Sequence, residues 1–144
     1  MYRRIAVGFD GSDSSRRALR KAITLAGCDG AEVVAILIQE HVPRYPEVES
    51  EVTEEREAIG EYLRQLQGEC EALGREAGVA VTVRMAAGNA PKLLCELTAQ
   101  ERADLLVIGA SGRSGLWGGM LGTTADKVVD HAPCSVLVVR PTKG

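Results

Sequence analysis

Hydrophobic residues along this chain gather in five short runs separated by longer amphipathic stretches. The runs cover residues 5–9, 33–38, 79–83, 105–108 and 135–139. Four of them are almost continuously apolar, which is typical of strands buried on both faces of a parallel sheet. The run at 79–83 alternates valine with polar or small residues, so it predicts an edge strand with one face in water.

The stretches between these runs have the three-to-four-residue period of amphipathic helices. One helix begins after a cap at Ser12 or Asp13 and ends near Gly27 to Gly30, and the longest runs from about Thr53 to Ala77. The third starts after Asn89, and the last presents its apolar face through Ala125, Val128, Val129 and Ala132. Residues 40–51 lack periodicity and predict a loop.

Strands and helices therefore alternate as βαβαβαβαβ. This order predicts an open parallel sheet of five strands with helices on both faces and right-handed crossovers. A length of 144 residues predicts one domain that spans residues 1–144.

The composition of the chain argues against several classes of function. Aromatic residues make up 3% of the chain and the net charge is −3, which argues against nucleic-acid binding. No apolar stretch reaches the roughly 20 residues of a membrane span, and no signal peptide is recognisable. The four cysteines are scattered and lack metal-binding spacing, so we interpret them as small hydrophobic residues of a protein in a reducing compartment. We expect a soluble cytoplasmic protein.

The chemistry concentrates after the run at 105–108, where a glycine-rich loop leads into a helix. Its glycines are Gly109, Gly112, Gly115, Gly118, Gly119 and Gly122. Thr123 and Thr124 then open the helix, and such a strand–loop–helix arrangement holds a phosphate on backbone N–H groups. The loop is not a Walker motif, because no lysine precedes Thr123, and its spacing does not fit G-x-G-x-x-G.

The spacing Gly109-x2-Gly112-x9-Gly122-Thr123 resembles the G-2x-G-9x-G-(S/T) pattern of nucleotide-binding universal stress proteins. The stretches VGFDGSDSSRRAL, AGNAPKLLCELTAQERADLLVIG and APCSVLVVRP also resemble that family. The resemblance implies a Rossmann-like sheet of strand order 3-2-1-4-5 and a bound ATP. It also implies a homodimer through the last strand, which fits the apolar edge expected at residues 135–140.

Ligands of such sheets bind beyond the carboxyl ends of the strands, where the strand order reverses. Asp10 and Gly109 follow the two strands that flank this point. Asp10 either accepts a ribose hydroxyl or helps to hold a phosphate-bound Mg²⁺, or it caps the following turn; these roles can coexist.

The resemblance further implies a role for seven other residues. Ile38 would contact adenine through its backbone above a floor of Val7, Gly8 and Phe9. Gly109 and Gly112 would let the loop wrap the ribose and phosphate. Gly122 and Thr123 would present N–H groups to the phosphates with the help of Thr124. Arg113 either screens phosphate charge or is a solvated loop residue.

The sequence thus predicts an ATP-binding universal stress protein that acts as a nucleotide-dependent sensor or regulator in the stress response. We find no clear catalytic base or arginine finger, so ATP hydrolysis should be slow or absent. The alternatives are a weak ATPase that acts as a switch and a dimeric scaffold that binds an unknown protein but no nucleotide.

The roles of several other side chains can be interpreted from the sequence. The basic stripe of Arg16, Arg17, Arg20 and Lys21 is a solvated helix face or an anion patch. Trp117 in the loop is a lid over the ligand or a contact for a partner. We interpret His41 as a surface residue and His131 as a structural one at a helix end.

Overall fold

The computed structural model describes residues 1–40, 49–110 and 122–141, with only the backbone of residues 49–53 and 55. The elements are β1 (Arg4–Gly8), α1 (Asp13–Asp29), β2 (Glu32–Gln39), α2 (Glu49–Ala77), β3 (Val81–Ala87), α3 (Ala90–Gln100), β4 (Leu105–Gly109), α4 (Thr123–His131) and β5 (Ser135–Val139). Every strand pairing is parallel, and the sheet order is β3-β2-β1-β4-β5. The predicted five-stranded parallel sheet and the order 3-2-1-4-5 are confirmed.

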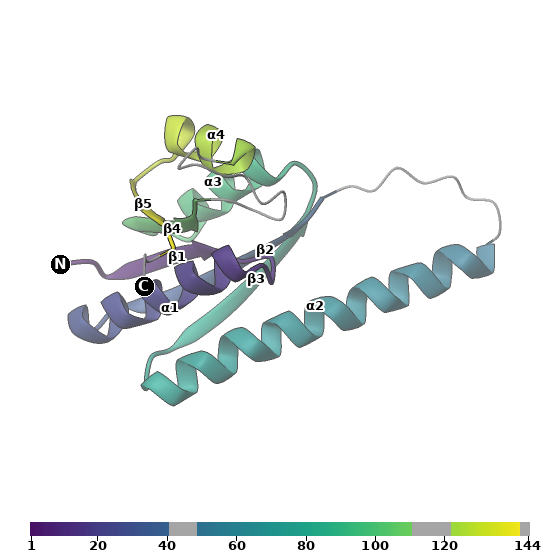
Figure 1. Cartoon of the computed structure of the whole chain (residues 1–144), viewed down its shortest axis with the longest axis horizontal. Helices are drawn as coiled ribbons and strands as arrows, with labels where there is room; N and C mark the ends of the chain where they lie inside the picture. The colour runs from purple at the N-terminus through teal and green to yellow at the C-terminus, as the bar shows by residue number, and fades with distance from the viewer. Residues whose placement is uncertain (41–48, 111–121, 142–144) are drawn as a thin grey trace.

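Two hydrophobic cores cover the two faces of the sheet. Successive side chains of a strand point to opposite faces, so Ile5 and Val7 of β1 pack under α1 and α2 while Ala6 packs under α3 and α4. Figure 1 shows α1 and α2 on one side of the sheet and α3 and α4 on the other. The continuous apolar runs of β1, β2 and β4 are explained by burial on both faces.

Local capping chemistry sets the ends of the helices. Ser12 caps α1, because its hydroxyl accepts the N–H of Ser15 at 3.2 Å. Asn89 caps α3 by accepting the N–H of Lys92 at 3.1 Å. Gly30 ends α1 in the left-handed conformation with φ 68°, which a residue without a Cβ adopts easily. These three caps stand where the sequence predicts helix ends.

Three boundaries or faces differ from the prediction. Helix α2 begins at Glu49 instead of near Thr53, because the acidic residues of this stretch suit a helix N-terminus. Strand β3 begins at Val81, since Val79 is buried in the turn where its N–H bonds to the carbonyl of Gly74 at 2.9 Å. Val129 is 44% exposed, because α4 is short and docks through Ala125 and Val128.

An ion pair fastens α2 to α1 on the same face of the sheet. The guanidinium of Arg16 donates to both carboxylate oxygens of Glu69. The distances are 2.7 Å from Nε to Oε2 and 3.1 Å from Nη2 to Oε1. Hydrogen bonding to Glu69 raises the pKa of Arg16. Arg16 is therefore not part of a purely solvated stripe, which corrects that reading of the basic face of α1.

The remaining predictions about the fold concern exposure. Cys70 is buried and the four cysteines are free. The Nδ1 atom of His131 lies 3.0 Å from the carbonyl of Lys127 in the last turn of α4, as expected of a structural histidine. In the part of the chain that the structure describes, no helix is long and apolar enough to cross a membrane.

Candidate functional site

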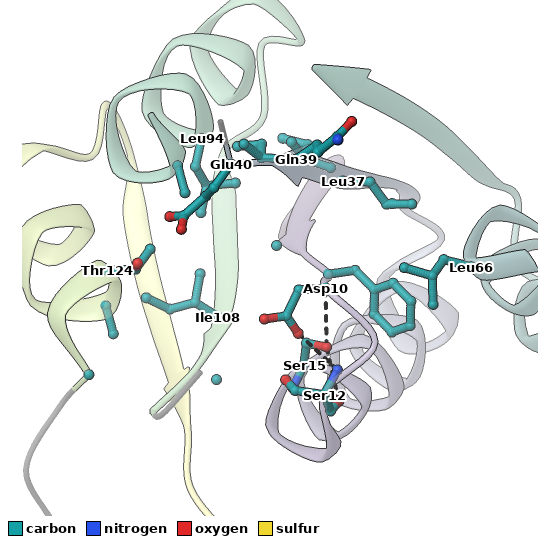
Figure 2. A pocket seen from close by; sticks show the side chains of 18 of the residues that line it. Asp10, Ser12, Ser15, Leu37, Gln39, Glu40, Leu66, Leu94, Ile108 and Thr124 are labelled. Atoms are coloured by element: carbon teal, nitrogen blue, oxygen red, sulfur yellow. Dashed lines mark hydrogen bonds between the residues drawn. The ribbon is translucent and has the colours of Figure 1, made fainter. Parts of the chain in front are cut away.

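A pocket lies at the carboxyl ends of β1, β2 and β4, the edge of the sheet where the strand order reverses. Its volume is about 630 Å³, within the range typical of small-molecule sites. Figure 2 shows side chains from the sheet, α1, α3 and α4 around the cavity, and Leu66 of α2 on the side away from Thr124 and Ile108. The parallel sheet brings these segments together because every strand ends, and every following helix begins, at the same edge.

Asp10 closes the turn that begins α1. Its Oδ1 atom accepts the N–H of Ser12 at 2.9 Å, and its own N–H donates to the hydroxyl of Ser15 at 3.2 Å. The Ser15 hydroxyl in turn donates to the carbonyl of Ser12 at 3.0 Å. Asp10 therefore has the capping role, and because its carboxylate also faces the pocket in Figure 2, a ligand role is geometrically compatible.

Gly109 sits where the end of β4 meets the first turn of α1. A Cβ on Gly109 would lie 2.8 Å from the carbonyl oxygen of Ser14 and would also overlap the Ser14 hydroxyl. Real Cβ atoms essentially never approach closer than 3.0 Å. The packing of α1 on β4 therefore requires glycine at this position, whatever ligand the pocket takes.

Gly122 is the N-cap of α4 and is buried. Its N–H donates to the carbonyl of Ala110 at 2.8 Å, while the N–H of Ala110 donates to the carbonyl of Val139 at 3.0 Å. The expectation that the Gly122 amide faces a phosphate is thus wrong in this structure, because that amide closes the chain onto Ala110. The N–H of Asp126 makes the first bond to the Gly122 carbonyl, so the amides of Thr123 and Thr124 precede the helical ladder.

The pocket brings together six of the predicted site residues: Asp10, Ile38, Gly109, Gly122, Thr123 and Thr124. Gly112 and Arg113 lie outside the described residues, and so do His41 and Trp117. Of the predicted floor, Gly8 and Phe9 line the pocket, whereas Val7 is buried in the core beneath α1 and α2. The side chain of Val7 points to that core because odd-numbered residues of β1 face α1 and α2.

Helix α2 forms a wall that the sequence analysis did not assign to the site. Ile59, Tyr62, Leu63 and Leu66 line the pocket from this helix. The Tyr62 hydroxyl donates to the carbonyl of Asp10 at 3.4 Å. Gly11, at φ 84°, leaves room for α2, since a Cβ there would lie 2.9 Å from both the Tyr62 hydroxyl and Leu66. The apolar stripe of α2 was visible in the sequence, but its position over the Asp10 turn was not.

Apolar side chains also line the pocket from α3 and from the strands. Leu94 of α3 approaches Gly8 so closely that a Cβ on Gly8 would be 3.1 Å from it. Ile38 and Ile108 line the same cavity. Apolar walls beside a few polar groups suit a flat heterocyclic ring. The sequence analysis predicted the start of α3 but did not assign it to the site, although the cap at Asn89 places it at the carboxyl edge of the sheet.

Comparison with known proteins places the chain in a family. The model of the universal stress protein family matches residues 1–140. A universal stress protein of Methanocaldococcus jannaschii is 33% identical over 147 residues, which cover 99% of this chain and 85% of the relative.

Solved structures of similar proteins share the fold. A universal stress protein in complex with cAMP has 27% sequence identity and a TM-score of 0.71, with 98% of each chain covered. A universal stress protein family protein from Arabidopsis thaliana with AMP bound has 20% identity and the same TM-score of 0.71, with 98% of this chain and 93% of that chain covered.

Proposed function

The chain belongs to the universal stress protein family, and we propose that it is a member that binds an adenine nucleotide and acts as a nucleotide-dependent regulator in the stress response. The observation that carries the proposal is the pocket of about 630 Å³ at the switch point of the sheet. Six of the eight predicted site residues line it. The two similar structures that hold cAMP and AMP support a nucleotide as the ligand.

In this proposal, each part of the nucleotide is assigned to a part of the pocket. The apolar lining of Ile38, Leu94 and Ile108 suits the adenine ring, with the Ile38 backbone at the edge of the ring. The carboxylate of Asp10 would accept a ribose hydroxyl. The phosphates would lie at the N-terminus of α4, where the amides of Thr123 and Thr124 and the positive end of the helix dipole favour an anion.

Mg²⁺ would accompany the phosphates of ATP, and Asp10 is the residue that would help to hold it. A carboxylate oxygen is a suitable partner for this ion, and Asp10 lines the pocket. No three His, Cys, Asp or Glu side chains among the described residues gather where they could hold a metal ion by themselves. Bound Mg²⁺ would neutralise part of the phosphate charge.

ATP hydrolysis by this site should be slow or absent. Phosphoryl transfer needs a positioned water and a cation that stabilises charge on the transferred group. The pocket residues that the structure describes include the carboxylates of Asp10 and Glu40 but no lysine, arginine or histidine. A weak ATPase that acts as a switch is the alternative, and the release of phosphate from ATP over hours measures the difference.

We also propose that two copies pair through β5. This strand forms an edge of the sheet. Because the Val139 carbonyl accepts the Ala110 N–H on the β4 side, the alternation of a strand places the N–H of Val138 on the outer side. Proline at position 138 would remove that outer donor and leave the β4 ladder intact.

Size-exclusion chromatography with light scattering tests the dimer. We expect the unchanged chain to elute as a dimer and Val138→Pro to elute as a folded monomer. Val139→Pro is the contrasting variant, because it removes a donor on the β4 side and should lower the stability of the fold itself. A dimer that persists in a folded Val138→Pro variant would rule out pairing through β5.

The nucleotide proposal is tested by calorimetric titration with adenosine, AMP and ATP plus Mg²⁺. Thr124→Asp puts a negative charge at the N-terminus of α4, where it suits the helix dipole but repels a phosphate. We expect AMP and ATP to bind about tenfold more weakly to this variant while adenosine changes by less than about twofold. Thr24→Asp, on the exposed side of α1, is the matched control and should change none of the three.

The outcomes separate nucleotide binding from its alternatives. Equal weakening of adenosine and AMP by Thr124→Asp would move the phosphate away from α4. If no heat of binding and no change of Trp117 fluorescence accompanied any of the three ligands, the nucleotide reading would fail. The remaining hypothesis would then be that the protein is a dimeric interaction scaffold.

A further inference from the structure

The described wall of the nucleotide pocket is negatively charged. Asp10 and Glu40 are its two charged side chains, and both are acidic. A ligand that carries phosphate groups therefore meets carboxylates on this wall, and like charges that face one another weaken binding. The N-terminus of α4 offsets only part of that repulsion, because a helix dipole amounts to roughly half an elementary charge.

The two carboxylates have different structural roles. Asp10 is part of the turn that begins α1, since its Oδ1 atom accepts the N–H of Ser12 at 2.9 Å. Glu40 directly follows the last residue of β2 and is exposed. It makes no hydrogen bond or ion pair with another described residue. The fold around the described part of the pocket therefore depends on Asp10 but not on the charge of Glu40.

The direction of the Glu40 side chain connects it with the ligand. Figure 2 shows its carboxylate directed into the cavity, toward the side where Thr124 lies in the first turn of α4. That side is where the phosphates are placed in the proposed function. A charge aimed at the phosphate end of the cavity acts on the phosphates more strongly than on the adenine ring.

We infer that Glu40 is a specificity residue that selects nucleotides by phosphate charge. The site takes adenine nucleotides whose phosphate charge is low, as in AMP, or neutralised by a divalent cation, as in Mg²⁺-bound ATP, and it discriminates against uncomplexed ATP. This inference rests on the proposed nucleotide binding and adds the ligand class to it. Adenosine, which carries no phosphate, is the neutral reference for every comparison.

Calorimetric titration of the full chain and of Glu40→Gln tests the inference. The ligands are adenosine, AMP, ATP with Mg²⁺ and ATP with a chelator. The substitution keeps the shape of the side chain and removes its charge, so uncomplexed ATP should bind about five- to tenfold more tightly. Adenosine should change by less than about twofold, with AMP and Mg²⁺-bound ATP in between.

A matched variant and a salt series separate the local charge from general effects. Glu76→Gln removes one carboxylate from the exposed far end of α2 and should leave all four affinities unchanged. Raising the salt from about 0.1 M to 1 M shortens the screening length from about 10 Å to 3 Å. The difference between the unchanged chain and Glu40→Gln for uncomplexed ATP should then shrink toward zero.

Two results would overturn the inference. One is a Glu40→Gln variant that binds uncomplexed ATP no more tightly than the unchanged chain does. The other is an equal change for ATP and adenosine, which would mean that Glu40 contacts the nucleoside. Both leave the proposed function standing if adenosine and AMP bind. If none of the four ligands binds the unchanged chain, the proposed function itself fails, and this inference fails with it.

Discussion

Replacing Gly109 with alanine tests the close approach of α1 to the end of β4. The added Cβ would lie 2.8 Å from the carbonyl oxygen and 2.9 Å from the carbonyl carbon of Ser14. Both atoms belong to the backbone of α1, so no side-chain rotation relieves the overlap. The chain must instead shift the first turn of α1 away from β4, and that turn carries the hydrogen bonds of Asp10.

The cost is the overpacking of a tight site by one methyl group. Such insertions destabilise by about 1–3 kcal/mol, while the stiffer unfolded chain of an alanine variant returns about 0.4–1 kcal/mol. The net destabilisation should be about 1–2 kcal/mol. For a chain of this size it corresponds to a fall in Tm of about 3–6 °C.

Thermal unfolding followed by circular dichroism measures this change. Gly68→Ala is the matched control, because Gly68 lies exposed in α2 and a Cβ there would meet nothing within 4 Å. Alanine in a helix interior is favoured over glycine by about 0.5–1 kcal/mol, so this variant should gain stability. The same substitution thus has opposite signs at two positions.

A second substitution locates the strain. Ser14→Ala in the Gly109→Ala background removes the overlapping hydroxyl but leaves both backbone contacts. It should therefore recover only part of the lost stability. A Tm of Gly109→Ala equal to or above that of the unchanged chain would refute the close packing, and a full recovery with Ser14→Ala would mean that only the hydroxyl was in the way.

Three further predictions test other parts of the fold. Burial of the Asp104 carboxyl opposes its ionisation, but hydrogen bonds from the N–H groups of Arg3 and Arg4 outweigh that effect and lower the pKa of Asp104. The stability that Asp104 contributes is therefore present above the unfolded pKa of about 3.9 and is lost as the pH falls through the folded pKa. Urea unfolding of Asp104→Asn should show lower stability at pH 7 and a smaller loss in acid, and an unchanged pH dependence would contradict this. Burial, with the charges of Glu69 and Glu71, raises the pKa of Cys70 to about 12. A thiol reagent at pH 8 should therefore label the exposed Cys28 of the folded chain, while Cys70 reacts only on unfolding. Rapid labelling of Cys70 in a Cys28→Ser variant would refute its burial. Glu69→Gln should cost about 0.5–1 kcal/mol in urea unfolding, because it weakens a two-point ion pair with Arg16, whereas Glu61→Gln on the exposed face of α2 should be neutral.

Short-range chemistry explains which elements of the fold could be predicted from the sequence. The strands β1, β2 and β4 were predicted because a strand buried on both faces must be apolar throughout. The caps at Ser12 and Asn89 were predicted because a cap is made by residues two or three positions apart. The strand order, in contrast, came from the resemblance to a family, since hydrophobic periodicity says nothing about which strands are neighbours.

The way in which distant segments meet at the pocket could not be predicted from the sequence. Tyr62 reaches the carbonyl of Asp10 across 52 positions of the chain, and no local pattern indicates that α2 lies over that turn. Ala110, and not a ligand, receives the Gly122 amide because β4 and α4 converge there. Helix caps and strand patterns depend on neighbours in sequence, whereas the walls and charge of the pocket depend on how crossovers lay helices across the sheet.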